Sequence, residues 1–156
     1  MASKSILITG GSGLVGAYAV GMLLERGARP VIFDVALNER LLAAVGVDTS
    51  KVTLIRGDMA DLPALISAIR ENDCDQIIHL AAFLGEEVQR RPYSGVRLNF
   101  MGTVNVFEAA RLEKVRRVIF PSSGTVYLGS LGEGLKQIDE TIPMNPPSVY
   151  AATKAS

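Results

Sequence analysis

The sequence predicts an α/β protein built on a doubly wound parallel sheet. Short apolar runs alternate along the chain with longer segments of helical periodicity. The runs are continuously apolar, which is typical of strands that are buried on both faces of a parallel sheet. Because right-handed crossovers join successive parallel strands, the intervening helices are expected to cover both faces.

Five apolar runs are expected to form the strands of this sheet: Ser5–Thr9, Pro30–Phe33, Lys51–Arg56, Gln76–Leu80 and Arg117–Pro121. Helical periodicity predicts three intervening helices: Leu14–Arg26 closed by Gly27, a helix capped by Asp61 that carries Leu62, Leu65, Ile66 and Ile69 on one face, and Gly95–Leu112. A polar loop is expected from Ser122, an irregular connection over Gly129–Pro147, and a further helix from Ser148. The sheet is therefore expected to be truncated after its fifth strand and the start of the following helix.

Composition excludes several classes of function. The 156 residues include 16 basic and 16 acidic side chains, so no charge excess directs the chain to nucleic acid or to an anionic membrane. A single cysteine, Cys74, excludes an internal disulfide and predicts no metal site. No apolar run approaches the ~20 residues of a membrane-spanning helix. With no signal-peptide pattern in Met1–Lys4, a cytoplasmic protein is expected.

A glycine-rich segment follows the first strand. In Thr9–Gly16, Gly10, Gly13 and Gly16 match the pattern GxxGxxG, and Gly11 gives the related GxGxxG. Glycines permit the tight turn and the close approach of a pyrophosphate, while the following helix N-terminus offers free N–H groups and a positive dipole end. A glycine-rich turn without a ligand is the alternative. The strand, the helix and a downstream acid favour a dinucleotide site.

That acid is Asp34, which lies 18 residues after Gly16 at the end of the second strand. A carboxylate there can accept hydrogen bonds from the ribose hydroxyls of adenosine. It would also repel a 2′-phosphate, and no basic residue follows directly, since Arg40 is distant. NAD is therefore predicted rather than NADP; a helix-capping role is the alternative. Asp58 is expected either to bind the adenine amino group or to cap a loop.

Tyr150 and Lys154 share one helical face because they are four residues apart. A free tyrosine has a pKa near 10, so a tyrosine base needs a nearby cation that favours its phenolate. Ser122 and Ser123 follow the fifth strand, where a hydroxyl can hold a substrate oxygen, since ligands of doubly wound sheets bind beyond the strand C-termini. A surface tyrosine beside a solvated lysine is the alternative.

Together these stretches resemble the extended short-chain dehydrogenase/reductase family, the group of NAD-dependent sugar epimerases and dehydratases with a Rossmann fold. The matching segments are TGGSGLVG, Asp34, Gly57-Asp58-Met59, His79-Leu80-Ala81-Ala82, Asn99 with Gly102-Thr103 and Asn105, Ser122-Ser123-x-x-Val126-Tyr127, and Tyr150-x-x-x-Lys154. The resemblance implies Tyr150 as proton acceptor and donor, Lys154 bonded to the nicotinamide ribose, and Ser123 in the place of the catalytic Ser/Thr, with Ser122 structural.

The predicted cofactor contacts are Gly10, Ser12, Gly13, Leu14, Val15, Gly16, Asp34, Asp58, Met59, Leu80, Ala81, Ala82, Asn99, Tyr150 and Lys154. Asn99 is equally interpreted as structural. His79, alone on an apolar strand, is expected to be a hydrogen-bonded core residue rather than a catalyst.

The resemblance implies hydride transfer from a hydroxyl-bearing carbon of a small molecule, with a sugar nucleotide as the expected substrate and a homodimer as the expected state of the full-length protein. Dehydratases of the group carry an acidic residue just before the Val-Tyr-like pair, where this chain has Gly124 and Thr125. An epimerase or a dehydrogenase is therefore favoured. Residues 1–156 are expected to form an incomplete NAD-binding domain without its substrate domain. A non-catalytic NAD sensor and a fragment without turnover are the alternatives.

Overall fold

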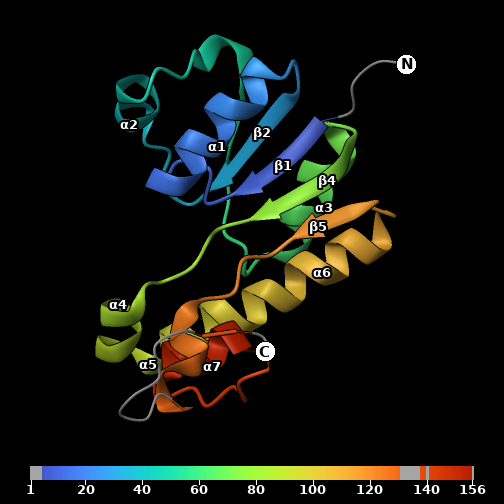
Figure 1. Cartoon of the computed structure of the whole chain (residues 1–156). Helices are drawn as coiled ribbons and strands as arrows, with labels where there is room; N and C mark the ends of the chain where they lie inside the picture. Colours follow the sequence, from blue (N-terminus) through green and yellow to red (C-terminus); the bar gives the residue numbers. More distant parts are fainter. Residues whose placement is uncertain (1–4, 131–137, 140, 156) are drawn as a thin grey trace. The chain divides into compact units, whose positions relative to one another are not determined.

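The computed structural model describes residues 5–130, 138–139 and 141–155. These residues form two compact units. The first consists of residues 5–82 and 102–120. The second consists of residues 83–101 and the described residues from 121 onward. Figure 1 labels most of the helices and strands along the chain.

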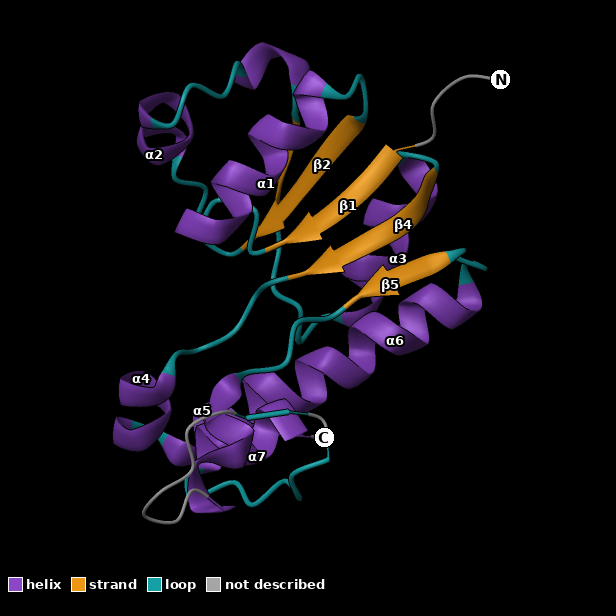
Figure 2. Cartoon of the chain, viewed as in Figure 1, coloured by secondary structure: helices purple, strands orange, loops and turns teal. Residues whose placement is uncertain are grey.

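The first unit contains a five-stranded sheet in which every pair of neighbouring strands is parallel, with the order β3-β2-β1-β4-β5. Figure 2 shows β2, β1, β4 and β5 side by side. The order changes direction between β1 and β4, which makes the carboxyl ends of these two strands the switch point where ligands of such sheets bind. The predicted doubly wound sheet is confirmed. The strands are β1 (Ser5–Thr9), β2 (Arg29–Asp34), β3 (Thr53–Arg56), β4 (Cys74–His79) and β5 (Arg117–Ile119).

Helices cover both faces of this sheet (Figure 1). On one face, α1 and α2 bury an apolar cluster against the sheet, in which Ile6, Ile8 and Ile32 meet Val20 of α1 and Leu42 of α2. Helices α3 and α6 lie on the other face. At the start of α3, Ala64 N–H donates to the Asp61 carboxylate at 3.0 Å, so Asp61 caps this helix. The helices are α1 (Leu14–Glu25), α2 (Glu39–Ala44), α3 (Leu62–Glu71) and α6 (Gly102–Leu112).

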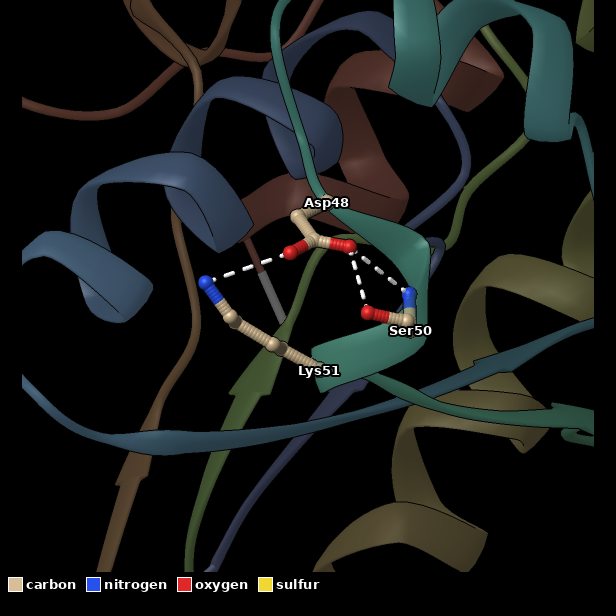
Figure 3. A network of polar contacts seen from close by, with 3 residues as sticks. All are labelled: Asp48, Ser50 and Lys51. Atoms are coloured by element: carbon tan, nitrogen blue, oxygen red, sulfur yellow. Dashed lines mark hydrogen bonds and ion pairs between the residues drawn. The ribbon is translucent and has the colours of Figure 1, made fainter.

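The third strand was predicted over Lys51–Arg56 but begins at Thr53, because Lys51 belongs to a 3-10 turn, η1 (Thr49–Lys51). Figure 3 shows the polar network that holds this turn. Asp48 Oδ1 accepts hydrogen bonds from Ser50 N at 3.1 Å and from Ser50 Oγ at 2.6 Å, and Asp48 Oδ2 pairs with Lys51 Nζ at 3.2 Å. The hydrogen bond from the Ser50 hydroxyl, followed by that from Lys51, holds the pKa of Asp48 below its ordinary value.

The second unit is built from short helical segments. The predicted continuous helix Gly95–Leu112 is wrong in one respect, because a π-helical turn, Arg97–Met101, interrupts it between α5 and α6. The predicted loop after Ser122 is also wrong in part, because Gly124–Ser130 forms a 3-10 helix. The remaining elements are α4 (Gly85–Arg90), α5 (Pro92–Val96) and α7 (Val149–Ala155).

Helix α7 begins where the sequence predicts. Ala151 N donates to Ser148 Oγ at 3.1 Å, and Ala152 N donates to Ser148 O at 2.9 Å, so Ser148 caps the helix. Of the predicted irregular connection Gly129–Pro147, residues 131–137 and 140 lie outside the described residues. No helix in the described ranges combines the length and apolar character needed to cross a membrane.

Candidate functional site

The turn between β1 and α1 depends on a glycine at its first position. Gly10 has a φ of +69°, a conformation that L side chains rarely adopt, and its N–H donates to Phe33 O at 3.0 Å. A Cβ at this position would lie 2.7 Å from Ala81 N, just beyond the end of β4. The turn therefore passes against the backbone at the switch point of the sheet, and only glycine fits there.

The other two glycines of the pattern have different roles. A Cβ at Gly16 would overlap Gly10 O and lie 2.6 Å from Gly11 Cα, so this glycine lets α1 start directly behind the turn. A Cβ at Gly13 would meet only Gly10 O, at 3.3 Å, and Gly13 is exposed at the N-cap of α1. No side chain caps this helix, so its first N–H groups are available to an anion.

The residues of this turn fit the pyrophosphate of a dinucleotide. Besides the uncapped N–H groups, the buried Ser12 Oγ has no hydrogen-bond partner among the described residues. An unsatisfied buried hydroxyl is costly, so its presence beside the turn is consistent with a polar ligand there. Leu14 and Val15, the first residues of α1, are 61% and 68% exposed and are thus accessible to that ligand.

Asp34 is joined directly to the glycine turn. It is the last residue of β2 and half-buried, and its Oδ2 accepts a hydrogen bond from Ser12 N at 3.1 Å. Its Oδ1 accepts from Ala36 N at 3.2 Å. Each carboxylate oxygen has further lone pairs for ligand hydroxyls. In dinucleotide-binding folds of this kind, a carboxylate at this place, beside the glycine turn, binds the adenosine ribose.

The next two predicted residues occupy the turn after β3. Asp58 Oδ1 accepts from Ala60 N at 2.8 Å, so this exposed carboxylate closes a local turn. The Met59 side chain is buried, and a Cβ at Gly102 of α6 would lie 2.8 Å from Met59 Cε. Asn105 Nδ2 donates to Met59 O at 3.0 Å. Met59 thus fastens the turn to α6, a role that spacing alone does not reveal.

The residues after β4 continue its alignment with β1. Leu80 N donates to Thr9 O at 3.0 Å, and Ala81 N donates to Thr9 Oγ1 at 3.4 Å. Leu80, Ala81 and Ala82 are all half-buried. The small side chains of the two alanines leave the backbone accessible beside Gly10, which is consistent with their predicted place next to a cofactor.

His79 is confirmed as a hydrogen-bonded core residue. It is fully buried, with Nδ1 2.6 Å from Thr9 Oγ1 and Nε2 3.0 Å from Thr103 Oγ1. Its ring stacks on that of Phe120, with centroids 5.3 Å apart. Because both ring nitrogens bind threonine hydroxyls inside the first unit, the histidine is part of the core.

In the second unit, Lys154 is buried on α7, one turn after Tyr150. Its Nζ donates to Pro121 O at 3.3 Å, and Ser122 Oγ donates to Lys154 O at 2.8 Å. Burial disfavours the ammonium and lowers the pKa of Lys154 below its ordinary value. The bond from Ser122 agrees with the structural role expected for that serine, since it ties the segment after β5 to α7.

Ser123 directly precedes the 3-10 helix Gly124–Ser130. Its Oγ accepts hydrogen bonds from Thr125 N at 3.3 Å and from Thr125 Oγ1 at 2.9 Å. A hydroxyl that accepts two bonds still carries its own proton, which it can donate to a substrate oxygen. Ser123 is half-buried, so the local fold orients this hydroxyl without enclosing it.

A hydrogen-bond chain that the sequence did not predict leads to Tyr150. Asn99, in the π-helical turn, accepts from Phe83 N at 2.8 Å, and its Nδ2 donates to Phe83 O at 3.0 Å and to Thr153 Oγ1 at 3.3 Å. Thr153 Oγ1 in turn donates to Tyr150 O at 2.8 Å. The Tyr150 ring lies near Gly85, where a Cβ would be 3.9 Å from Tyr150 Cδ1.

These contacts give Asn99 a structural role within the second unit, whereas a cofactor contact of Asn99 stays a prediction. Thr153 is the residue that sequence reasoning missed. Its position in the sequence could have indicated this role, because Thr153 follows Tyr150 by three residues and a helical threonine often donates to the carbonyl one turn earlier.

Comparison with known proteins places these features in a family. Residues 7–156 match the family model described as GDP-mannose 4,6 dehydratase. The UDP-glucose 4-epimerase uge1 of Schizosaccharomyces pombe is 34% identical over 156 residues, which cover 96% of this chain and 44% of that protein. The D-erythronate dehydrogenase of Cupriavidus necator is 32% identical over 157 residues, which cover 97% of this chain and 47% of the relative.

A solved structure gives the same result. The UDP-glucose 4-epimerase of Thermus thermophilus, crystallised with NAD, matches with a TM-score of 0.85 and 31% identity over 97% of this chain and 47% of that one. The chain spans about half the length of the relatives it matches. It belongs to the GDP-mannose 4,6 dehydratase family, within the extended short-chain dehydrogenase/reductase group of NAD-dependent epimerases and dehydratases, and corresponds to the N-terminal part of its relatives.

Proposed function

We propose that this chain binds NAD and supplies the proton-transfer residues for oxidation of a hydroxyl-bearing carbon in a sugar nucleotide. The observation that carries the proposal is the buried Lys154, which is held by Pro121 O one helical turn after Tyr150. A buried ammonium is costly unless it is hydrogen-bonded and has a negative partner. We assign that partner to the phenolate of Tyr150, which lies four residues earlier on the same helical face.

Cofactor binding is assigned to the first unit. The N–H groups at the start of α1 bind the pyrophosphate, and the Asp34 carboxylate accepts hydrogen bonds from the ribose hydroxyls. Ser12 N–H keeps that carboxylate oriented through the 3.1 Å hydrogen bond. When bound, NAD supplies the hydride acceptor.

Proton transfer is assigned to the second unit. The Tyr150 phenolate accepts the proton of the substrate hydroxyl, and Ser123 Oγ–H donates to the oxygen that becomes a carbonyl. The same carbon would lose its hydrogen as hydride, for which bound NAD would be the acceptor. In the reverse direction Tyr150 returns the proton to the oxygen. This is general acid–base catalysis by a group whose charged form a cation stabilises.

The substrate class follows from the relatives and from one departure in this chain. The two relatives described above are named as a UDP-glucose 4-epimerase and a D-erythronate dehydrogenase, and both names point to a polyhydroxylated substrate. Gly124 and Thr125 stand before Val126-Tyr127, and neither can act as the acid of a dehydratase. We therefore favour epimerisation of a sugar nucleotide over dehydration. We also propose that the whole protein is a homodimer, which light scattering would test.

The proposal is tested on the protein encoded by the whole reading frame, with UDP-glucose and UDP-galactose as substrates. We expect interconversion of the two sugars, and its loss in Tyr150→Phe while NAD binding measured by calorimetry stays within about twofold of wild type. Tyr127→Phe is the matched control, because it removes a hydroxyl from a tyrosine outside α7. Turnover of Tyr150→Phe near the wild-type rate would contradict the assignment of Tyr150 as the base.

A further inference from the structure

An arginine lies beside Asp34 on the neighbouring strand. In the register of β2 and β3, Asp34 is paired with Arg56, and Gly57 N donates to Asp34 O at 3.0 Å. The two strands lie about 4.8 Å apart, and paired residues project from the same face because the pleats of neighbouring strands are aligned. The spacing along the sequence, 22 residues, hides this proximity, which exists only because the strands pair.

Despite this register, no ion pair joins Asp34 to Arg56 among the described residues. The Asp34 oxygens accept instead from the backbone N–H groups of Ser12 and Ala36, at 3.1 and 3.2 Å. Arg56 is exposed at the carboxyl end of β3, the edge strand of the sheet. Its guanidinium therefore remains available to a ligand that binds next to the Asp34 carboxylate.

The chemistry of that ligand follows from its neighbours. The proposed ribose contact puts the 2′-oxygen of the adenosine at the Asp34 carboxylate. A phosphate on this oxygen would be repelled by Asp34 and attracted by a cation one strand away. Arginine binds phosphate through two parallel N–H donors, so a guanidinium within one strand spacing suits a 2′-phosphate.

We propose that Arg56 is a second determinant of cofactor choice. Its guanidinium can bind the 2′-phosphate of NADP, but the negative charge of Asp34 repels that phosphate and so prevents the contact. The inference rests on the proposed NAD site. It adds that a cation suited to a 2′-phosphate is already present on β3, so that removal of the Asp34 charge should expose it. Arg40, the first basic residue after Asp34 in the sequence, lies in α2, outside the pairing of β2 with β3.

The test is a double-mutant cycle read by calorimetry on the 156-residue chain, with NAD and NADP as the two titrants. The quantity compared is the ratio of the NADP affinity to the NAD affinity, because loosening of the glycine turn by the substitution affects both affinities. Asp34→Asn should raise this ratio at least about tenfold, and adding Arg56→Ala should remove most of the gain. Arg56→Lys in the same background should retain part of it, since it keeps the charge without the bidentate geometry.

Arg40→Ala is the matched control, an exposed arginine on the next element after β2. It should leave the ratio within about twofold of its parent. An equal loss of NAD and NADP affinity in Arg56→Ala would overturn the inference, because it would place Arg56 against a part common to both dinucleotides. So would a gain in Asp34→Asn that survives Arg56→Ala. Failure of the wild-type chain to bind NAD would instead overturn the proposed function, and the inference with it.

Discussion

Gly10→Ala should lower the stability of the chain for two reasons, a strained backbone conformation and a steric clash. Gly10 lies in the turn that we assign to the pyrophosphate. The φ of +69° strains any L residue, which costs about 1–2 kcal/mol. The added Cβ would also lie 2.7 Å from Ala81 N, a backbone atom that cannot rotate away, and overpacking of this kind costs about 1–3 kcal/mol. The expected total is about 2–5 kcal/mol, or a fall in melting temperature of roughly 5–15 °C.

Gly27→Ala is the matched control for this prediction. Gly27 has a φ of +71°, but a Cβ there would meet nothing within 4 Å. This variant should therefore lose only the conformational part, about 1–2 kcal/mol. Urea unfolding followed by circular dichroism measures both variants. A Gly10→Ala chain that is no less stable than Gly27→Ala would refute the argument that the turn packs against the end of β4.

Three further predictions concern the second unit. Tyr150→Phe in the protein of the whole reading frame should abolish turnover while NAD binding persists, as steady-state kinetics and calorimetry would show; strong loss of NAD binding would contradict it. Thr153→Val should lower kcat and leave the KM for NAD unchanged. Thr153→Ser keeps the hydroxyl that donates to Tyr150 O, so it should retain the wild-type kcat. A low kcat in Thr153→Ser would contradict a positioning role for this hydroxyl. Burial lowers the pKa of Lys154, so the unfolded chain binds the Lys154 proton more tightly than the folded chain does. The free energy of unfolding should therefore increase as the pH rises toward 10.5. Lys154→Met should flatten that increase in urea unfolding measured at several pH values, and an unchanged slope would contradict the prediction.

The sheet of the first unit could be predicted because its strands carry their signal locally. Ser5–Thr9 is continuously apolar, and the glycine pattern and Asp34 mark the first two strand ends. Helix α2 escaped prediction because its six residues are too few to establish a period. The turn Thr49–Lys51 escaped because it depends on the side-chain bonds of Asp48, which compete with the strand pattern.

The second unit was less predictable for a related reason. The apolar periodicity of Gly95–Leu112 continues through Arg97–Met101, although the backbone there forms a π-helical turn. The side chain of Asn99, which lies in this turn, bonds to Phe83 and Thr153, which are distant from it in sequence. Likewise, strand pairing brings Arg56 beside Asp34, and no local pattern contains that information.

The most direct test of the central claim is a calorimetric titration of NAD into the 156-residue chain and into its Asp34→Ala variant. The account predicts one NAD per chain and at least about tenfold weaker binding in the variant. The melting temperature should fall by only a few degrees, because the substitution removes the acceptor of the Ser12 and Ala36 N–H groups at a half-buried position. Equal affinities for NAD in the two chains would contradict the assignment of Asp34 to the ribose, and an absence of binding by the wild type would contradict the NAD site itself.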